Sequence, residues 1–402
     1  MINKIEKIFA EEMKDSRGNS TIKVTMFSSG IFDSFSVPSG ASTGVHEAYV
    51  LETDKAIENV NTIIASALVG QDIENQKEID EILIQLDGTK NKNRLGGNAI
   101  IGVSIACAKT AAKVKGIEVY EYLRSLEDIK SSRKVPFLYM NLVNGGKHAK
   151  NNLAFQEYHI VPITDDIGEV VEIGIKIQNS IREIILEKYG EESLVLGDEG
   201  GYAPKIIDIR EPLLILNEAI GKNNLQNKVR LALDVAASSF YEDGIYKIEN
   251  KNVTKEELMD IYKELISEFN LLSIEDPFDE EDFESFAQLK TQNPNLKVVG
   301  DDLTVTNVGR VKEAIQKGSI NAMIIKPNQI GTLSETLETM KLARENNIEL
   351  IVSHRSGETD DDFIADLVYA FGCYGLKSGA PQKPERRIKY DRLKKISTET
   401  IN

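Results

Sequence analysis

Short β-branched runs that alternate with helical stretches constrain the fold most strongly, and they begin after Arg133. Strand and helix repeating at roughly 20–40-residue spacing are typical of parallel strands with right-handed crossovers. About eight such strands favour a closed α/β barrel over an open sheet. The runs are Tyr158–Pro162, Leu194–Gly197, Val229–Val235, Leu271–Ile274, Lys297–Val299, Met323–Ile325, Leu350–Val352 and a weaker run near Leu376.

The residues before this repeat have a different pattern. Lys4–Ala10 and Thr21–Ser28 alternate as strands around a turn in DSRGNS, and helical spacing follows, with GGNAIIGVSIACAKTAAKV as a buried helix. A chain of 402 residues has room for two cores. We therefore predict a smaller N-terminal α+β capping domain over residues 1–130 and a C-terminal eight-stranded α/β barrel, the catalytic domain, over residues 131–402.

Ionisable residues follow five successive runs directly. One acid at such a position is more often a helix cap or a solvated loop residue. Five in a row point to function, because the C-terminal ends of barrel strands meet at one mouth, where barrel active sites are built. The residues are Asp234, Glu275 with Asp276, Asp301 with Asp302, Lys326, and His354 with Arg355.

The acids at this mouth form a set of hard oxygen ligands. One carboxylate from each of three strands, namely Asp234, Glu275 or Asp276, and Asp301 or Asp302, suits Mg²⁺, which also keeps positions for water and substrate oxygens. Zn²⁺ is disfavoured, because the four histidines have no zinc-site spacing with the two cysteines. The sequence therefore predicts a magnesium site.

Lys326 is expected to project into the same mouth. A lone lysine at a strand end is more often a surface residue or a phosphate-binding cation, but beside three acids a general base is sensible. Its pKa would have to fall from about 10.4, and Mg²⁺ and Lys377 would lower it. Such a base can take the proton next to a metal-bound carboxylate, because the metal stabilises the resulting enediolate.

Two further groups of residues complete a reaction site. The segment GDEGG offers Glu199, beside Asp198, as a second proton-transfer group, although DEGG is also a tight turn. Arg355, Ser356 and Lys377 are suited to phosphate oxygens.

Several other classes of protein are excluded or disfavoured. Templates for dinucleotide, Walker-type phosphate or serine-hydrolase sites are missing, and SGASTG, which lacks the lysine of a phosphate loop, is better interpreted as a turn or mobile lid. The net charge of −16 disfavours nucleic acid and anionic membranes. Cys107 and Cys373 suit reduced core thiols, and Ala99–Val114 suits a buried helix rather than a membrane span. Without a secretory signal, we expect a cytoplasmic protein.

Eight motifs follow one another along the chain: SGASTGVHEA, NGGKHAKNNLAFQE, GDEGGYAP, SIEDPF, GDDLTVTN, IIKPNQIGTLSET, SHRSGET and KSGAPQKPERRIKYDRL. The chain closely resembles enolases, which are phosphopyruvate hydratases, from about Ile5 to Leu393, and the resemblance implies a TIM-like, enolase-type barrel. SHRSGET and the KxNQIGT pattern are specific to that family, whereas related barrel lyases and racemases share only the metal-ligand layout.

The resemblance implies a role for each matching residue. Lys326 would accept the C2 proton of 2-phosphoglycerate, and Glu199 would protonate the departing hydroxide. The resemblance selects Glu275 over Asp276 and Asp301 over Asp302. The first Mg²⁺ would then be held by Asp234, Glu275 and Asp301. Ser42 would help to bind a second Mg²⁺ together with substrate. The substrate-binding set would be His148, Gln156, Glu157, Lys326, Arg355, Ser356 and Lys377.

Two segments depart from the family pattern. Ser239 stands where the family usually has Glu, and LETDKAIEN lacks the common Arg-Asp-Gly-Asp sequence, which bears on loop anchoring and subunit contacts. The resemblance further implies a homodimer, or an octamer built from dimers.

Two alternative functions stay open at this point. One is a moonlighting role as a surface-displayed binding protein or scaffold of the same fold. The other is a related barrel enzyme that acts on another carboxylate. The basic run KPERRIKYDRLKK near the end is interpreted as a solvated helix or tail.

Overall fold

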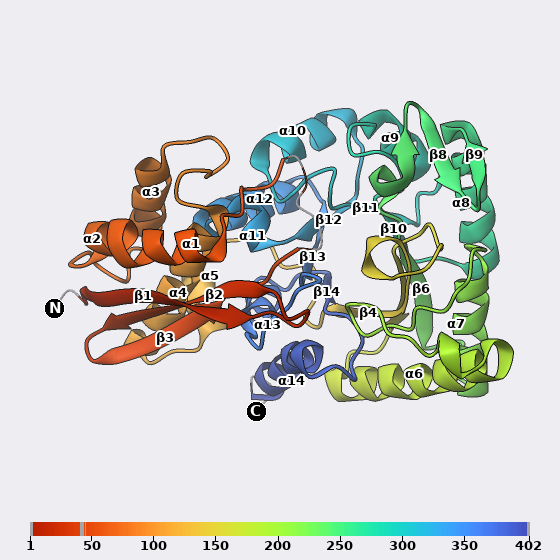
Figure 1. The fold of residues 1–402 in the computed structure, drawn as a ribbon, viewed down its shortest axis with the longest axis horizontal. Coiled ribbons are helices and arrows are strands. Elements are labelled where there is room, and N and C mark those ends of the chain that lie inside the picture. The colour runs from red at the N-terminus through yellow and green to blue at the C-terminus, as the bar shows by residue number, and fades with distance from the viewer. Residues whose placement is uncertain (1–2, 41–43, 45, 400–402) are drawn as a thin grey trace.

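The computed structural model of the chain describes residues 3–40, 44 and 46–399. An N-terminal part with an antiparallel sheet lies against a closed barrel, which occupies the right-hand side of Figure 1. The architecture confirms the predicted α/β class, with a smaller N-terminal part and an eight-stranded barrel.

The N-terminal sheet has three strands in the order β1-β2-β3. Asp15 closes the predicted first turn, because its Oδ1 accepts the backbone N–H groups of Arg17 at 2.9 Å and Asn19 at 2.9 Å. The second turn, Ser29–Gly30, has positive φ at both residues, as tight hairpins require. The third strand was not predicted. The strands are β1 (Ile5–Lys14), β2 (Ser20–Ser28) and β3 (Ile31–Ser36).

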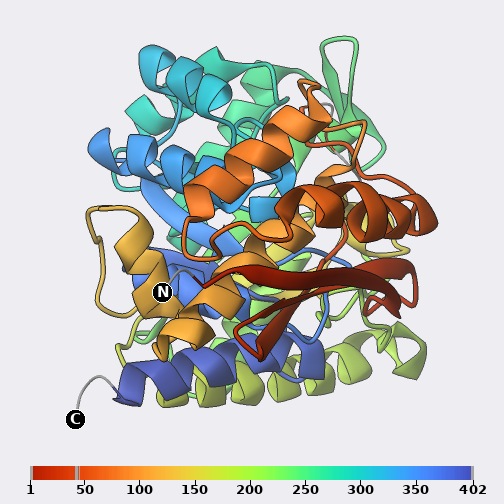
Figure 2. The ribbon, with the colours of Figure 1, turned by 90° about the vertical axis from the view of Figure 1, so that its left-hand side faces the viewer.

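Helices cover one side of this sheet (Figure 2). The predicted buried helix is α4, which packs on β2 and β3 so closely that a Cβ at Gly102 would lie 2.7 Å from Val24. Among the described residues, no helix combines the length and the apolar character needed to cross a membrane. The helices are α1 (Thr53–Asn59), which continues through a π-helical turn (Val60–Ile64) into α2 (Ala65–Leu68), then α3 (Gln76–Asp87), α4 (Gly97–Lys115) and α5 (Val119–Leu126).

The barrel closes in the strand order β10-β11-β12-β13-β14-β4-β5-β6. Its strands are short and almost wholly buried, which explains their continuous β-branched runs. They are β4 (Phe137–Asn144), β5 (Glu157–Pro162), β6 (Val229–Asp234), β10 (Ser273–Glu275), β11 (Lys297–Gly300), β12 (Ala322–Ile325), β13 (Glu349–Ser353) and β14 (Gly375–Lys377).

Two details of the predicted barrel are wrong. Leu194–Gly197 is not a strand: Val195 and Leu196 are exposed, and this stretch is a loop held by a hydrogen bond from the Gly197 N–H to the Gly201 carbonyl. The eighth strand is instead β4, which was not predicted. The barrel is also not wholly parallel, because β5 runs antiparallel to both β4 and β6. A loop joins β4 to β5 without a crossover helix, and such a connection reverses the strand.

Helices surround the barrel, and a small sheet of β7 (Tyr241–Glu242), β8 (Ile245–Ile248) and β9 (Lys251–Val253) extends from it. Short 3₁₀ turns lie at Gly146–His148, Glu191–Ser193 and Ala237–Phe240. The helices are α6 (Ile167–Tyr189), α7 (Glu211–Lys222), α8 (Lys255–Phe269), α9 (Phe283–Gln292), α10 (Val308–Lys317), α11 (Pro327–Ile330), α12 (Leu333–Glu345), α13 (Phe363–Ala370) and α14 (Pro384–Glu399).

The basic run near the end forms α14, which lies beside α6 (Figure 2). The helix was predicted, but its solvation was not correct: Arg386, Lys389 and Tyr390 are fully buried. Charges are buried only with partners, and these partners come from distant segments. Cys107 and Cys373 are free and buried, as expected for core thiols.

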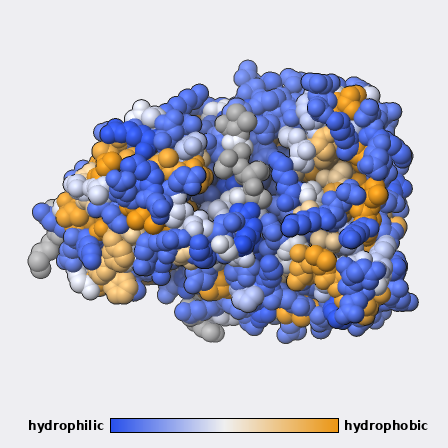
Figure 3. All heavy atoms as spheres, in the orientation of Figure 1, coloured by the Kyte–Doolittle hydropathy of each residue, from blue (hydrophilic) through white to orange (hydrophobic). Residues whose placement is uncertain are grey.

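The N-terminal part contacts the barrel near its mouth. Ser39 and Gly357 exchange two backbone hydrogen bonds of 2.8 Å, and the Ala48 N–H donates to the Gln329 carbonyl at 2.8 Å. On the face shown in Figure 3, hydrophilic residues predominate and apolar residues are scattered over both parts.

Candidate active site

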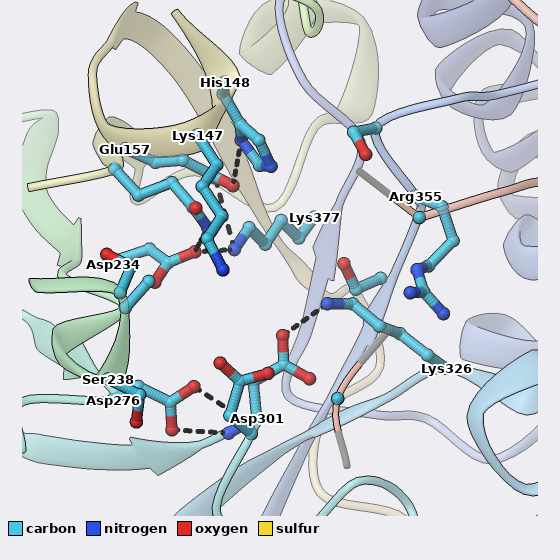
Figure 4. A pocket seen from close by; sticks show the side chains of 18 of the residues that line it. Lys147, His148, Glu157, Asp234, Ser238, Asp276, Asp301, Lys326, Arg355 and Lys377 are labelled. Atoms are coloured by element: carbon cyan, nitrogen blue, oxygen red, sulfur yellow. Dashed lines mark hydrogen bonds and ion pairs between the residues drawn. The ribbon is translucent and has the colours of Figure 1, made fainter. Parts of the chain in front are cut away.

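The residues predicted at strand ends do converge at the carboxyl end of the barrel. Asp234 ends β6, Glu275 ends β10 and Lys377 ends β14, whereas Asp301 and Lys326 come directly after β11 and β12. Except for Glu275, these residues line a cavity of about 330 Å³, and Figure 4 shows their side chains pointing into it.

Glu275, the last residue of β10, and Asp276, which follows it, have different partners. Asp276 accepts the backbone N–H groups of Asp301 at 3.0 Å and Asp302 at 2.8 Å, so its oxygens hold the loop after β11. Glu275 instead faces Lys377 at 2.9 Å. Both acids therefore already have partners, and the choice of Glu275 over Asp276 as a metal ligand stays a prediction.

Lys377 lies within a cluster of carboxylates. Its Nζ is 2.9 Å from Asp234, 2.9 Å from Glu275 and 3.2 Å from Glu157, and all four residues are buried. Burial raises the pKa of Glu275 well above its usual value, and repulsion by Asp234 adds to this although Lys377 opposes it. Burial and Glu157 likewise raise the pKa of Asp234 against the opposing effect of Lys377.

This excess of buried negative charge fits a divalent cation. Hard carboxylate oxygens are the ligands that Mg²⁺ prefers, and a buried cation would relieve their mutual repulsion. Among the described residues, however, the predicted set of Asp234, Glu275 and Asp301 is not one of the groups whose ligand atoms all lie within 4.8 Å. The groups are His46 with Glu280 and Glu281, His148 with Glu157 and Glu199, and Asp276 with Asp301 and Asp302.

Lys326 forms a short ion pair with Asp301 (Figure 4). Burial, Arg355 and Lys377 lower the pKa of Lys326, but Asp301 outweighs them and the pKa lies above its usual value. This is opposite to the direction that was expected for a base. A cation bound by Asp301 would compete with Lys326 for that carboxylate. It would thereby remove the main cause of the raised pKa of Lys326.

Glu199 does not end a strand but lies on the loop after Gly197. Its Oε2 accepts a 3.0 Å hydrogen bond from Asn141 of β4, and its Oε1 lies 3.2 Å from Nε2 of His354 and 3.6 Å from Nδ1 of His148. Burial and Glu157 raise its pKa, whereas His354 and His148 outweigh them and lower it. Negative charge on a bound ligand would raise it again.

Glu157 and its neighbours form one wall of the cavity. Because β5 is reversed, Glu157 at its start lies beside Asp234 at the end of β6. Glu157 accepts a hydrogen bond from His159 at 2.8 Å and lies 3.2 Å from His148, while Gln156 donates to Asp234 at 3.4 Å.

The opposite wall carries Arg355 and Ser356. Arg355 pairs with Glu47 of the N-terminal part at 3.1 Å and donates to Asn328 at 2.9 Å. Ser356 is buried and lines the same cavity. Both parts of the chain therefore contribute to the mouth.

Three sequence observations concern the surroundings of the site. Ser42 and its two neighbours in SGASTG, Ala41 and Thr43, lie outside the described residues. Ser239 is exposed and lines the cavity. The departing segment LETDKAIEN contains the whole of α1, and Asn98 of α4 anchors its first residue, Leu51, by two hydrogen bonds to the backbone of that residue, at 3.2 Å and 2.9 Å.

Sequence reasoning missed several residues of this region: Asn141, His159, Glu47, Gln329 and Arg386. Asn141 was lost with strand β4, although the largely apolar run after Pro136 could have indicated a strand. Glu47, Gln329 and Arg386 interact with the site through residues far away in the sequence, whereas His159 interacts with Glu157, two residues before it on β5.

Comparisons with known proteins find matches over nearly the whole length of the chain. Two family models match: "Enolase, N-terminal domain" over residues 5–123 and "Enolase, C-terminal TIM barrel domain" over residues 132–402. The chain belongs to the enolase family. It is 46% identical to the enolase of Methanocaldococcus jannaschii, over 98% of this chain and 95% of the relative. It is 43% identical to enolase B of Dictyostelium discoideum over the same shares of each chain. Membership of the enolase family implies a metal cofactor, in line with the acidic groups at the mouth.

Proposed function

We propose that this enolase-family chain catalyses the reversible dehydration of 2-phospho-D-glycerate to phosphoenolpyruvate, the phosphopyruvate hydratase reaction of glycolysis and gluconeogenesis. It is a hydro-lyase. The observation that carries the proposal is that Lys326 and Glu199 line one buried cavity whose wall also carries acids.

In the dehydration direction, Nζ of Lys326 takes the proton from C2. The electron pair of that C–H bond forms the C2–C3 double bond as the C3–O bond breaks. Glu199 supplies a proton to the departing hydroxide, which leaves as water. In the hydration direction the same two groups exchange their roles.

Asp234, Glu275 and Asp301 would hold Mg²⁺, with Ser42 as a ligand of a second Mg²⁺. Bound Mg²⁺ would stabilise the negative charge that develops on the substrate carboxylate. The excess of buried acids supports this assignment.

The remaining polar residues would bind and orient the substrate. Arg355, Ser356 and Lys377 offer donors to phosphate and carboxylate oxygens. His148, Gln156 and Glu157 would lie beside the reacting carbon atoms, and the burial of Glu157, Arg355, Ser356 and Lys377 would limit access of bulk water.

The decisive experiment is a turnover assay with purified protein and 2-phosphoglycerate. Ultraviolet absorbance of phosphoenolpyruvate should appear with Mg²⁺ and stop with EDTA. Lys326→Ala and Glu199→Gln should each lower kcat by roughly 10²–10⁴-fold. Absence of turnover by the folded, Mg²⁺-supplied wild-type protein would refute the proposal.

Neither alternative function is favoured. The full-length matches are to enolases, so a scaffold or surface-binding role has no independent support from them. Activity on a carboxylate without phosphate would indicate the related barrel enzymes instead.

The oligomeric state and the cellular location of the enzyme are also proposals. We infer a cytoplasmic homodimer, or an octamer of dimers, with any display at the cell surface as a secondary location. The domain boundary at residue 130 stays a prediction. Light scattering measures the oligomer, and cell fractionation tests the location.

A further inference from the structure

Arg386 of α14 is a fully buried cation that lies behind the cavity rather than in its lining. Its Nη1 donates to Nδ1 of His354 at 2.8 Å and to the Arg355 carbonyl at 2.6 Å. Its Nη2 donates to the carbonyls of Ser356 at 2.7 Å and Asp198 at 3.2 Å. One guanidinium thus joins the segment after β13 to the loop that carries Glu199.

This contact determines the protonation of His354. A guanidinium has only donors, so Nδ1 of His354 must accept and carries no proton. In the neutral ring the proton is then on Nε2, which lies 3.2 Å from Oε1 of Glu199. A second proton on Nδ1 would point directly at a cation.

The charged groups around His354 come from four segments. Glu199, Glu157 and Glu358 favour its charged form, and Arg386 opposes it. Lys389 pairs with Glu358 at 2.7 Å and so compensates that acid. Burial is the largest cause that lowers the pKa of His354, and with Arg386 it outweighs Glu199 and Glu157.

We propose that Arg386 is a positioning residue that keeps His354 as the neutral Nε2–H tautomer beside Glu199, so that Glu199 can take up and release its proton. An imidazolium at the same place would hold Glu199 as a carboxylate by an ion pair and suppress proton donation. The inference rests on the proposed role of Glu199 as the proton donor.

The position of the Glu199 loop does not depend on Arg386 alone. Lys383 donates to the Asp198 carbonyl at 3.1 Å, and the Ala380 N–H donates to the Glu199 carbonyl at 3.0 Å. Removing Arg386 should therefore change the protonation of His354 more than the place of Glu199.

The first test is nitrogen NMR of the wild-type enzyme with labelled histidine, assigned with His354→Gln. His354 should show an unprotonated Nδ1 and a protonated Nε2 from about pH 5 to about pH 8, the interval in which an ordinary histidine titrates. A protonated Nδ1, or an imidazolium at neutral pH, would overturn the proposal. This test needs no variant of Arg386.

The second test compares Arg386→Met, Arg386→Lys and the control Arg387→Met, which removes the neighbouring cation of α14 that pairs with Asp391 at 2.7 Å. Arg386→Met should lower kcat about tenfold to a hundredfold at neutral pH, within the contribution of a general acid. Activity should recover as rising pH deprotonates His354, KM should change little, and Arg386→Lys should restore part of kcat. A loss that is independent of pH, or equal in Arg387→Met, would contradict the proposal.

A double variant separates this proposal from the proposed function. If Arg386 acts through His354, Arg386→Met should have no further effect on the pH profile in a His354→Gln background. An additional pH-dependent loss there would show that Arg386 acts elsewhere. Full turnover by Glu199→Gln would refute the role of Glu199 but leave the NMR result on His354 unchanged.

Discussion

Gln329 donates a hydrogen bond to Oδ1 of Asp301 over 3.0 Å, which links a proposed metal ligand to the segment that carries Lys326. Its Oε1 accepts from the hydroxyl of Thr306 at 2.9 Å, and that hydroxyl accepts the Lys326 N–H at 2.9 Å. One buried amide therefore orients the acid and, through Thr306, the backbone of the proposed base.

Gln329→Leu should weaken metal binding. Loss of a hydrogen bond that orients a ligand typically costs about 10–100-fold in metal affinity. Activity measured against Mg²⁺ concentration gives the midpoint. The exposed Gln316→Leu in α10 is the matched control, and an unchanged midpoint in Gln329→Leu would show that Asp301 needs no such support.

Lys326→Ala and Glu199→Gln should separate the two proton transfers. In deuterated water Lys326→Ala should lose exchange at C2 of 2-phosphoglycerate together with turnover, because its base is missing. Glu199→Gln should keep C2 exchange while its turnover falls roughly 10²–10⁴-fold. Mass spectrometry of recovered substrate measures the exchange, and the opposite pattern would reverse the two roles.

Lys389→Met should destabilise the fold by about 3–5 kcal/mol, because it leaves Glu358 as an unpaired buried charge. Urea unfolding measures this loss. The control is Lys395→Met, which removes an exposed lysine from the same helix. An equal loss of stability in both variants would show that the ion pair with Glu358 is not the cause.

The same ion pair gives a pH dependence. Burial alone would raise the pKa of Glu358, but Lys389 and Arg386 outweigh it and hold the pKa below its usual value. A depressed folded pKa contributes stability above the unfolded pKa of about 4.3, and this is lost as pH falls through the lower folded value. Unfolding free energies measured from neutral pH to below that value should decline less steeply in Lys389→Met than in wild type.

Asp80→Ala should loosen the N-terminal part from the barrel. Asp80 of α3 accepts the Ser334 N–H at 2.9 Å and the Ser334 hydroxyl at 2.6 Å, so it caps α12 from another part of the chain. A lost cap costs about 0.5–2 kcal/mol. Urea unfolding should show this loss, and Asp80→Asn, which keeps an acceptor oxygen, should lose less.

Local pattern predicted the strands that bear Asp234 and Lys326, because each follows an unbroken apolar run. Local pattern did not predict β4, because Asn141 interrupts its apolar run and Asn144 ends it. Both asparagines are nevertheless buried. The run Leu194–Gly197 was similar in composition yet forms a loop: Leu196 makes an isolated β-bridge to Tyr202, and Val195 and Leu196 are exposed.

Ion pairs and hydrogen bonds between charged residues far apart in the chain could not be predicted from local sequence patterns. Arg386 and Lys389 look like solvated residues in sequence, and only their partners at residues 354–359 explain their burial. The raised pKa of Lys326 likewise depends on Asp301, which is 25 residues away in the chain.

The reversed strand β5 leaves the β4–β5 connection with both of its ends at the rim of the barrel. A crossover connection must travel the length of the wall and pack a helix, so changing it disturbs the scaffold. Residues 145–156, which join β4 to β5, do not cross the wall of the barrel and contain no crossover helix. Substitutions at the exposed positions Lys147, Lys150 and Asn152 can reshape the surroundings of the substrate, whereas Leu153 and Phe155 of the same loop are buried in the core.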